Sequence, residues 1–296
     1  MNRRMIFLAI TAIALASLAC SININLPSTE VKTGPTQTET ISVPLLSNKE
    51  TIADVTIQFG AGNLALQPAS GVPTDLINGT AKYNVVDLKP VVTVNNSTIT
   101  IEQGNLKLTG IPITNSKVVN DWSLSLANAP MNLTVKAGAY QGQYELGGLS
   151  IQNLNVTDGA SKVDLNFTNP NQVQMTSLQY TTGASEVTLK GLANSCATDI
   201  TFRGGAGNYT LEFSGKLQSN MNVSVEAGVS QVTIIVPMGV NAQVITETGL
   251  MTVSTSGGWQ QQGSNYSLSG SGNTITINVK MGAGNLKLET APATNK

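Results

Sequence analysis

The stretch Gly282-Ala283-Gly284-Asn285-Leu286-Lys287-Leu288 recurs along the chain and organises it. Two close copies and three looser ones begin at Gly60, Gly205, Gly159, Gly183 and Gly228. Each copy follows an alternating segment whose first apolar residue lies five positions before the glycine. The unit therefore reads apolar-x-apolar-x-x-Gly-small-small-x-apolar-x-apolar. Alternation on both sides of the glycine predicts two strand segments that meet at a corner.

The copies are regularly spaced. From Gly138 to Gly228 the steps between their glycines are 21, 24, 22 and 23 residues, and Gly249 adds a weaker step of 21. An insertion around residues 254–272 separates the last full copy, which begins at Gly282. Periods in this range are typical of repeat proteins, whose units stack to share one core.

From residue 51 onward no helical period is present, and Val, Ile, Thr, Leu and Asn dominate, which predicts an all-β fold. Alternation places Val163 and Leu165 inward and Asp164 toward water. A third apolar position follows the corner in three copies, at Leu149, Leu192 and Leu217. Three inward segments joined by glycine corners predict one turn of a β-solenoid, since glycine supplies positive φ and lets backbones approach closely. A stack of antiparallel hairpins that turn at the same glycines is the alternative.

The N-terminus has the features of a targeting segment. Arg3 and Arg4 precede an apolar run from residue 5 to residue 19, which is shorter than the roughly 20 residues of a membrane-spanning helix. We expect a signal peptide over residues 1–19. The sequence Ser17-Leu18-Ala19-Cys20 resembles a bacterial lipobox, although Ser17 stands where an aliphatic residue is usual. That resemblance implies lipidation of Cys20 and a membrane anchor on the extracytoplasmic side, and ordinary secretion is the alternative.

The remaining chain divides by composition. Residues 20–48 are rich in Thr, Ser and Pro and predict a flexible tether. Residues 49–128 contain one copy of the unit followed by non-repeating strands, and we expect them to cap the stack, with Trp122 closing its core. A ligand-binding role for Trp122 is the alternative. Residues 129–290 hold the solenoid repeats, and residues 291–296 are expected to be a disordered tail. The last strands, over residues 274–288, are the candidate cap at the other end.

Several motifs together resemble a known family. In order along the chain they are Gly60-Ala61-Gly62-Asn63, residues 76–85, Lys89-Pro90-Val91-Val92 and Asp121-Trp122-Ser123-Leu124. This order is similar to that of toast-rack domains, which have no known function and are related to candidate β-solenoid adhesins and to the extracellular part of cell-wall-antibiotic-response regulators. The resemblance covers residues 51–289. Relatives often carry aspartate at the positions of Asn63, Asn208 and Asn285, so calcium binding at the corners is disfavoured here.

The composition excludes several kinds of chemistry. The formal net charge is −1 and only 11% of residues are charged, which does not favour nucleic acid as a partner. The chain has no histidine, so the commonest general base and the commonest transition-metal ligand are both missing. The two cysteines, Cys20 and Cys196, cannot form a disulfide framework or enclose zinc by themselves. We expect no cofactor, no metal and no enzymatic activity.

The outward positions define two polar rows across the copies. One contains Ala65, Asp164, Thr188, Thr210, Thr233 and Lys287, and the other contains Asn63, Lys162, Glu186, Asn208, Gln231 and Asn285. Lys162, Asp164 and Glu186 are the one group that could converge as a glycan-cleaving site, and a solvated ion pair is the favoured interpretation. Cys196 is expected to pack on a corner rather than to react.

These observations predict a lipid-anchored cell-envelope protein whose β-solenoid binds or adheres without catalysis. Its partners would be the membrane, through the lipid, and a cell-wall glycan or a protein. The alternative is an envelope-stress sensor that acts through a membrane partner, as the resemblance to the antibiotic-response regulators implies.

Overall fold

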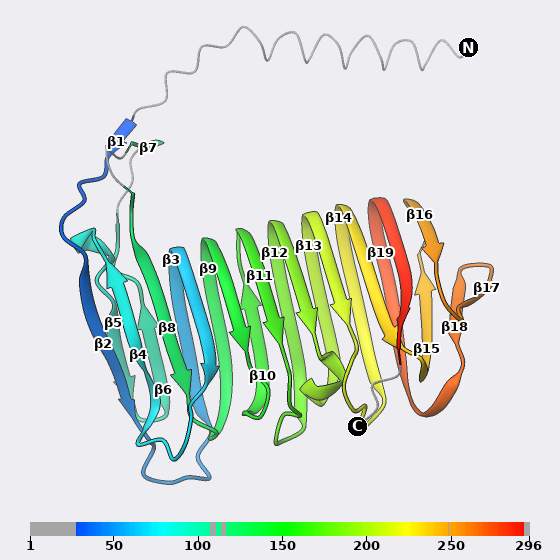
Figure 1. The fold of residues 1–296 in the computed structure, drawn as a ribbon, viewed down its shortest axis with the longest axis horizontal. Helices are drawn as coiled ribbons and strands as arrows, with labels where there is room; N and C mark the ends of the chain where they lie inside the picture. The colour runs from blue at the N-terminus through cyan, green and yellow to red at the C-terminus, as the bar shows by residue number, and fades with distance from the viewer. Residues whose placement is uncertain (1–27, 107–110, 114–116, 248, 293–296) are drawn as a thin grey trace, which may run out of the picture. The chain divides into compact units, whose positions relative to one another are not determined.

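The computed structural model describes residues 28–106, 111–113, 117–247 and 249–292. The chain forms two units, one of residues 1–33 with 106–117 and the other of residues 34–105 with 118–296. In the first unit, β1 (Ser28–Glu30) pairs in parallel with β7 (Ile111–Ile113). The second unit contains every other element (Figure 1). Its elements are β2 (Gln37–Pro44), β3 (Ala53–Pro68), β4 (Asp75–Tyr83), η1 (Val86–Leu88), β5 (Val91–Asn95), β6 (Thr98–Glu102), β8 (Asn120–Leu126), β9 (Pro130–Glu145), β10 (Ser150–Thr157), β11 (Ala160–Asn166), β12 (Met175–Lys190), η2 (Leu192–Ser195), β13 (Ala197–Glu212), β14 (Met221–Pro237), β15 (Gly239–Thr246), β16 (Leu250–Thr255), β17 (Gln260–Gln262), β18 (Asn265–Leu268) and β19 (Gly270–Ala291).

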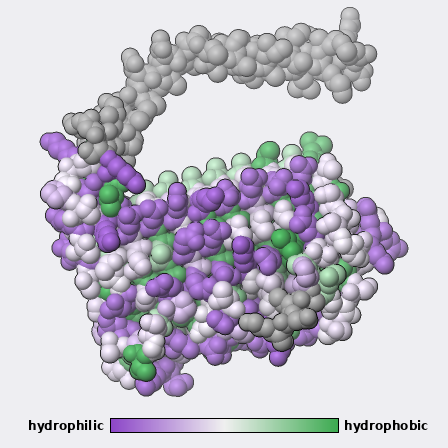
Figure 2. Space-filling view, viewed as in Figure 1, coloured by the Kyte–Doolittle hydropathy of each residue, from purple (hydrophilic) through white to green (hydrophobic). Residues whose placement is uncertain are grey.

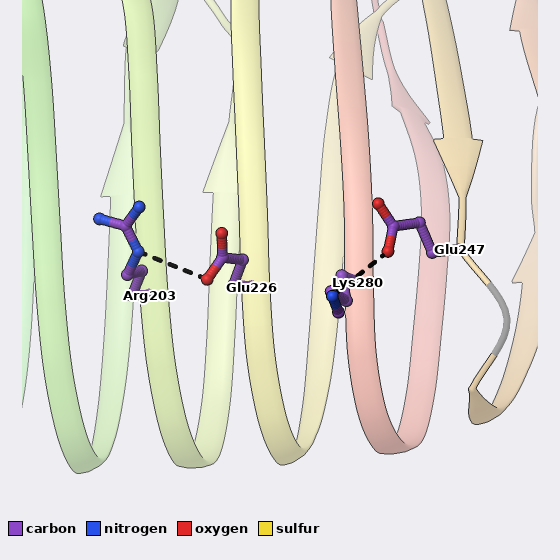
Figure 3. Close-up of polar contacts among 4 residues, drawn as sticks. All are labelled: Arg203, Glu226, Glu247 and Lys280. Atoms are coloured by element: carbon purple, nitrogen blue, oxygen red, sulfur yellow. Dashed lines mark hydrogen bonds and ion pairs between the residues drawn. The ribbon is translucent and has the colours of Figure 1, made fainter.

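The predicted all-β class is confirmed: over the described ranges the only helical elements are the two short 3₁₀ turns, η1 and η2. The long strands continue without a break through the repeated glycines, as β12 does at Gly183. The long strands drawn in Figure 3 bend sharply part-way along, so that each forms two arms of one rung. In β13, Phe202 on one arm and Tyr209 on the other have ring centroids 4.9 Å apart. The two arms therefore face each other across the core.

Successive rungs pair in parallel and in register on both arms. Before the glycine, Leu178 pairs with Ile200, Ile200 with Val223, and Val223 with Ile277. After the glycine, Val187 pairs with Tyr209, Tyr209 with Val232, and Val232 with Leu286. The alternative of stacked antiparallel hairpins is wrong, because neighbouring copies pair in parallel. The arrangement agrees with the predicted solenoid rungs.

The arms build two sheets. We call the sheet of arms before the glycine the leading sheet and the sheet of arms after it the trailing sheet. The strand order is β5-β6-β3-β9-β10-β12-β13-β14-β19-β15-β18-β17 in the leading sheet and β2-β4-β8-β3-β9-β11-β12-β13-β14-β19-β16 in the trailing sheet. Apolar side chains alternate inward from both sheets into one continuous core.

Chain order and spatial order differ at both ends. β19 lies between β14 and the pair β15/β16, although β15 and β16 precede it in sequence. The prediction that residues 274–288 cap the stack is therefore wrong: β19 is internal, and β16 and β17 are the outermost strands. The inserted segment around residues 254–272 forms β17 and β18, which return the chain to the inner position (Figure 1). At the opposite end, β6 and β8 lie outside β3.

Trp122 lies in the core near the β2 end. Its side chain is 2% exposed and meets Phe59 edge-on, with ring centroids 5.2 Å apart. The indole Nε1 donates a hydrogen bond of 3.0 Å to Asn120 Oδ1. Since β4 and β2 lie beyond β8, Trp122 fills the interior behind two further strands.

The repeated corner glycines are required for close packing between rungs. A Cβ carbon at Gly205 would lie 2.6 Å from the carbonyl oxygen of Gly183, and one at Gly228 would lie 2.5 Å from that of Gly205. The expectation that these glycines supply positive φ is wrong for them. Positive φ occurs two residues later in the copies that carry a second glycine there, with values of 152° at Gly207 and 129° at Gly284.

The predicted third inward segment is a connection rather than a strand. Leu149 and Leu192 are fully buried, and Leu217 packs partly buried against the core. None of the three lies in a strand, and Leu192 begins η2. Each rung thus has two arms, and an apolar residue in the connection closes the open end of the core.

The tether and tail boundaries need correction. β2 lies inside the predicted tether of residues 20–48, and it pairs with β4 while Ile41 and Val43 are buried. Alternation of these two β-branched residues suffices for a strand once a partner is present. Ala291, the first residue of the predicted tail, ends β19, and residues 293–296 are outside the described residues. The predicted signal peptide, residues 1–19, and Cys20 also lie outside the described residues. No helix in the described part of the chain combines the length and the apolar character needed to span a bilayer.

Candidate functional site

The two predicted polar rows lie on the outer face of the trailing sheet. Asp164 pairs with Thr188, Thr188 with Thr210, and Thr210 with Thr233, and the second row runs in the same register. β9 adds a rung that the prediction omitted, with Gln141 and Gln143 between β3 and β11. The rows are therefore continuous across the stack, with one residue of each row on every rung.

Lys162 and Glu186 form an ion pair of 3.1 Å, and both side chains are more than half exposed. Asp164 instead accepts a hydrogen bond of 3.0 Å from Gln143 Nε2. Exposed pairs of this kind contribute about 0–1 kcal/mol to stability. The structure thus agrees with a solvated ion pair at the three residues that could have formed a glycan-cleaving site.

The leading sheet carries a chain of hydrogen-bonded amides. Asn132 Nδ2 donates to Asp54 Oδ1 at 2.8 Å, and Asn153 Nδ2 donates to Asn132 Oδ1 at 2.9 Å. Ser177 Oγ donates to Asn153 Oδ1 at 3.1 Å. These bonds link four neighbouring rungs. The side chains hold the stack together and keep part of their hydrogen-bonding capacity facing water.

A row of charges crosses the leading sheet just before the bend. Arg203 pairs in register with Glu226, and Glu226 with Lys280. Arg203 Nε lies 3.4 Å from Glu226 Oε2, and Lys280 Nζ lies 3.5 Å from Glu247 Oε2 (Figure 3). The signs alternate along the row. Because each of the four side chains is about half exposed or more, the row can exchange its internal partners for groups of a ligand.

An open hollow of about 620 Å³ lies beside this row, and we call it the turn-edge hollow. Its lining residues are Thr181, Thr182, Arg203, Gly204, Gly205, Glu226, Ala227, Gly228, Gly249, Lys280, Met281 and Gly282. The repeated glycines leave backbone exposed along its floor. The hollow combines charged side chains with peptide groups, so it offers both donors and acceptors to a polar ligand.

Small apolar residues border the hollow along the bends. Val229 pairs with Ala283, and Ala283 with Leu250. Val229 is 69% exposed and Leu250 is 85% exposed. Figure 2 shows the edge of the stack as a pale green line above the more polar face. The hollow therefore has one charged side and one apolar side.

A second hollow, of about 400 Å³, lies near Trp122 and is lined also by Asn63, Lys82 and Asp121. The Trp122 ring is almost fully buried, so its face is not available for stacking on a ligand. Asn63 Nδ2 donates a hydrogen bond of 2.6 Å to Asp121 Oδ1. The packing role predicted for Trp122 agrees with this geometry better than the ligand-binding alternative does.

Sequence reasoning missed a buried polar cluster around Asp158. Its carboxylate accepts hydrogen bonds from Tyr180 at 2.6 Å, from Tyr140 at 3.4 Å and from Thr182. Burial raises the pKa of Tyr180 and of Tyr140 well above the ordinary value, and the Asp158 charge adds to the effect. Asp158, Tyr140 and Tyr180 are all buried, so the cluster is closed to a substrate. The one available signal was an acidic residue directly before a corner glycine.

Cys196 is buried where η2 ends, and its Sγ accepts a hydrogen bond of 3.2 Å from Gln218 Nε2. Burial raises the pKa of the thiol, which disfavours the reactive thiolate. No group of three or more His, Cys, Asp or Glu side chains among the described residues could hold a metal ion.

Comparison with known proteins identifies one family model. The model described as "N-terminal domain of toast_rack, DUF2154" matches residues 32–190 and 170–235. None of the curated proteins matches the chain.

Solved structures resemble the chain over most of its length. A candidate cell adhesion protein from Clostridium sporogenes ATCC 15579 is 19% identical, with a TM-score of 0.47, and the match covers 87% of this chain and 100% of that one. A candidate adhesin from Bacteroides fragilis NCTC 9343 is 12% identical, with a TM-score of 0.38 and coverage of 88% and 99%. A candidate lipid-binding protein from Parabacteroides distasonis ATCC 8503 is 10% identical, with a TM-score of 0.35 and coverage of 88% and 99%. These likenesses are too distant to carry a function to this chain.

Proposed function

We propose that this chain, which belongs to the toast_rack N-terminal domain family, DUF2154, is a non-catalytic adhesion protein. It is anchored outside the cell and binds a hydroxyl-rich polymer, such as a cell-envelope glycan. The turn-edge hollow is the observation that carries this proposal. It spans several rungs and places alternating charges beside exposed glycine backbone. A polymer laid across the rungs would meet exposed glycine backbone about every 4.8 Å and a charge of the same sign about every 9.6 Å.

The position of the aromatic side chains supports a polar polymer over a protein as the ligand. Every tyrosine, tryptophan and phenylalanine in the described residues is buried. Protein interfaces draw most of their binding energy from exposed aromatic and arginine anchors. The outer faces here offer amides, hydroxyls and paired charges instead, which suit many modest hydrogen bonds.

Anchoring is the second part of the proposal. Arg3, Arg4 and the apolar run that ends directly before Cys20 support export and lipidation of that cysteine. A single acyl chain holds a protein only marginally, whereas two or more chains anchor it stably. Growth with labelled palmitate tests the assignment. We expect label on the wild type and none on Cys20→Ser, and equal label on both would overturn the anchor.

Binding can be tested by co-sedimentation with purified, insoluble cell-wall glycan. We expect the wild type to sediment and the double variant Arg203→Ala/Glu226→Ala to bind at least tenfold more weakly. The matched control is Lys162→Ala/Glu186→Ala, which removes one exposed ion pair from the trailing sheet and should bind normally. No sedimentation of the wild type with any glycan, or equal loss in both double variants, would overturn the proposed site.

A further inference from the structure

Over the residues that the structure describes, each sheet ends in strands that pair on one side only, and these edges differ in how they are protected. Exposed edges invite pairing with another chain, and proteins usually block them with charges, proline or short length. β2 carries Glu39 and ends at Pro44, and β17 has three residues. β5 carries no charge and no proline, and among the described residues it pairs only with β6.

β5 also leaves apolar surface open. Val92 pairs with Ile101, and Val94 pairs with Ile99, so these valines share the core-facing side of the sheet. Ile99 and Ile101 are fully buried, yet Val92 is 38% exposed and Val94 is 49% exposed. The core is thus covered up to β6 and uncovered at β5, the last strand of that sheet.

The sequence of β5 is close to self-complementary. If two copies of Val91–Asn95 run antiparallel about a two-fold axis at Thr93, then Val92 of one copy lies opposite Val94 of the other. Both such pairs fall on the core-facing side, and the two Thr93 residues meet on the outer side. The apolar strip would then continue from one molecule into the next.

We propose that β5 is a self-association site, at which the leading sheets of two copies join through antiparallel β5–β5 pairing centred on Thr93. An isologous contact of this kind closes after two subunits. The site is separate from the turn-edge hollow, which β12, β13, β14, β19 and Gly249 line. Dimerisation would give each particle two hollows, and two linked sites bind a polymer more tightly than one.

β16 is the competing edge, because it is also uncharged and free of proline. Its inward side chains, Met251 and Val253, already pack against the core. β5 is therefore the edge at which pairing covers more exposed core-facing surface.

Replacing Thr93 by a charged residue tests the proposal in the full chain. Thr93 is exposed on the outer side, so Thr93→Lys and Thr93→Glu should leave the fold intact. In a dimer of either variant, two side chains of like charge would lie directly opposite each other at position 93. By sedimentation velocity we expect the wild type to dimerise with rising concentration, each variant to stay monomeric, and an equimolar mixture of the two variants to dimerise again. A wild type that is monomeric throughout, or dimers that persist in both variants, would overturn the site.

A disulfide reporter fixes the register. In a Cys20→Ser/Cys196→Ser background, Thr93→Cys should form a covalent dimer on mild oxidation, because directly opposed residues lie within reach of a disulfide. Thr100→Cys is the matched control, since Thr100 pairs with Thr93 but lies in β6, one strand in from the edge. Equal crosslinking of both variants would contradict β5 pairing. Loss of the dimer in Thr252→Lys but not in Thr93→Lys would assign it to β16 instead.

Discussion

Gly205 lies directly against the carbonyl group of Gly183 in the neighbouring rung. A Cβ carbon at position 205 would come within 2.6 Å of that carbonyl oxygen, which is closer than non-bonded carbon and oxygen atoms approach each other. The same relation recurs between Gly228 and Gly205. At the bend, the distance between neighbouring rungs therefore leaves room for the hydrogen of glycine and not for a Cβ carbon.

We expect Gly205→Ala to destabilise the protein by about 1–3 kcal/mol, the usual range for overpacking, and Gly205→Val to destabilise it further. Gly34→Ala is the control, because a Cβ there would lie 3.8 Å from its nearest neighbour, Asn84 O. Urea denaturation monitored by circular dichroism measures both. If the two alanine variants had equal midpoints, close backbone approach would not explain the glycine column.

The repeat pattern predicts the rung and its register but not the order of rungs. Alternation around each glycine identifies which residues face inward, and Val223, Val232 and Leu286 lie where the pattern places them. Each copy of the unit is chemically alike, so nothing in the period says that β19 would insert between β14 and β16. That choice depends on the excursion through β17 and β18, in which β18 pairs with the distant strand β15, Ala242 with Leu268.

The candidate site was only partly predictable. The rows on the trailing sheet follow from the residues after each glycine, and the structure reproduces them. The charged row requires knowing that Lys280 stacks on Glu226, although 54 positions separate them, and that β15 brings Glu247 to the other side of Lys280. Asp158 was hidden for a different reason: an acidic residue at a corner reads as solvent-facing unless its hydroxyl partners are known.

Asp158→Ala should be strongly destabilising. The substitution removes the acceptor for the buried Tyr180 hydroxyl, and a buried donor left unpaired costs about 1–3 kcal/mol. Thr182 also loses Asp158 as a partner, although Ser185 Oγ stays within hydrogen-bond distance at 2.6 Å. We expect a total loss of about 3 kcal/mol in the free energy of unfolding. Asp164→Ala, at a partly exposed position on the next strand, should change it by less than about 0.5 kcal/mol. Thermal melts of both variants make the comparison, and similar melting temperatures would refute a structural role for the cluster.

Trp122→Ala should cost about 3–5 kcal/mol, as large-to-small changes of a buried tryptophan do. Trp122→Phe keeps ring contact with Phe59 but loses the hydrogen bond to Asn120, and we expect a smaller loss of about 1–2 kcal/mol. Chemical denaturation gives both values. Near-native stability of the alanine variant would show that the core does not depend on this ring.

The buried tyrosines predict loss of stability in alkali. Burial raises the pKa of Tyr140, Tyr144 and Tyr180 well above the value of about 10 that each has in the unfolded chain. The folded state thus keeps protons that the unfolded state releases. The resulting stabilisation is fully present below pH ~10 and falls above it, by about 1.4 kcal/mol per pH unit for each tyrosine.

Urea midpoints measured between pH 8 and pH 11.5 test this dependence. We expect little change up to pH ~10 and a steep fall beyond it. The variant Tyr144→Phe removes one titrating group while keeping the ring in the core, so the fall above pH ~10 should be shallower by about one tyrosine's share. In the wild type the Tyr144 hydroxyl donates a hydrogen bond to Tyr140. Its removal leaves the hydrogen bonds of Tyr180 and Thr182 to Asp158 in place. An identical slope in wild type and variant would mean that Tyr144 ionises as readily in the folded state as in the unfolded chain, and its burial could not then be the source of the alkaline instability.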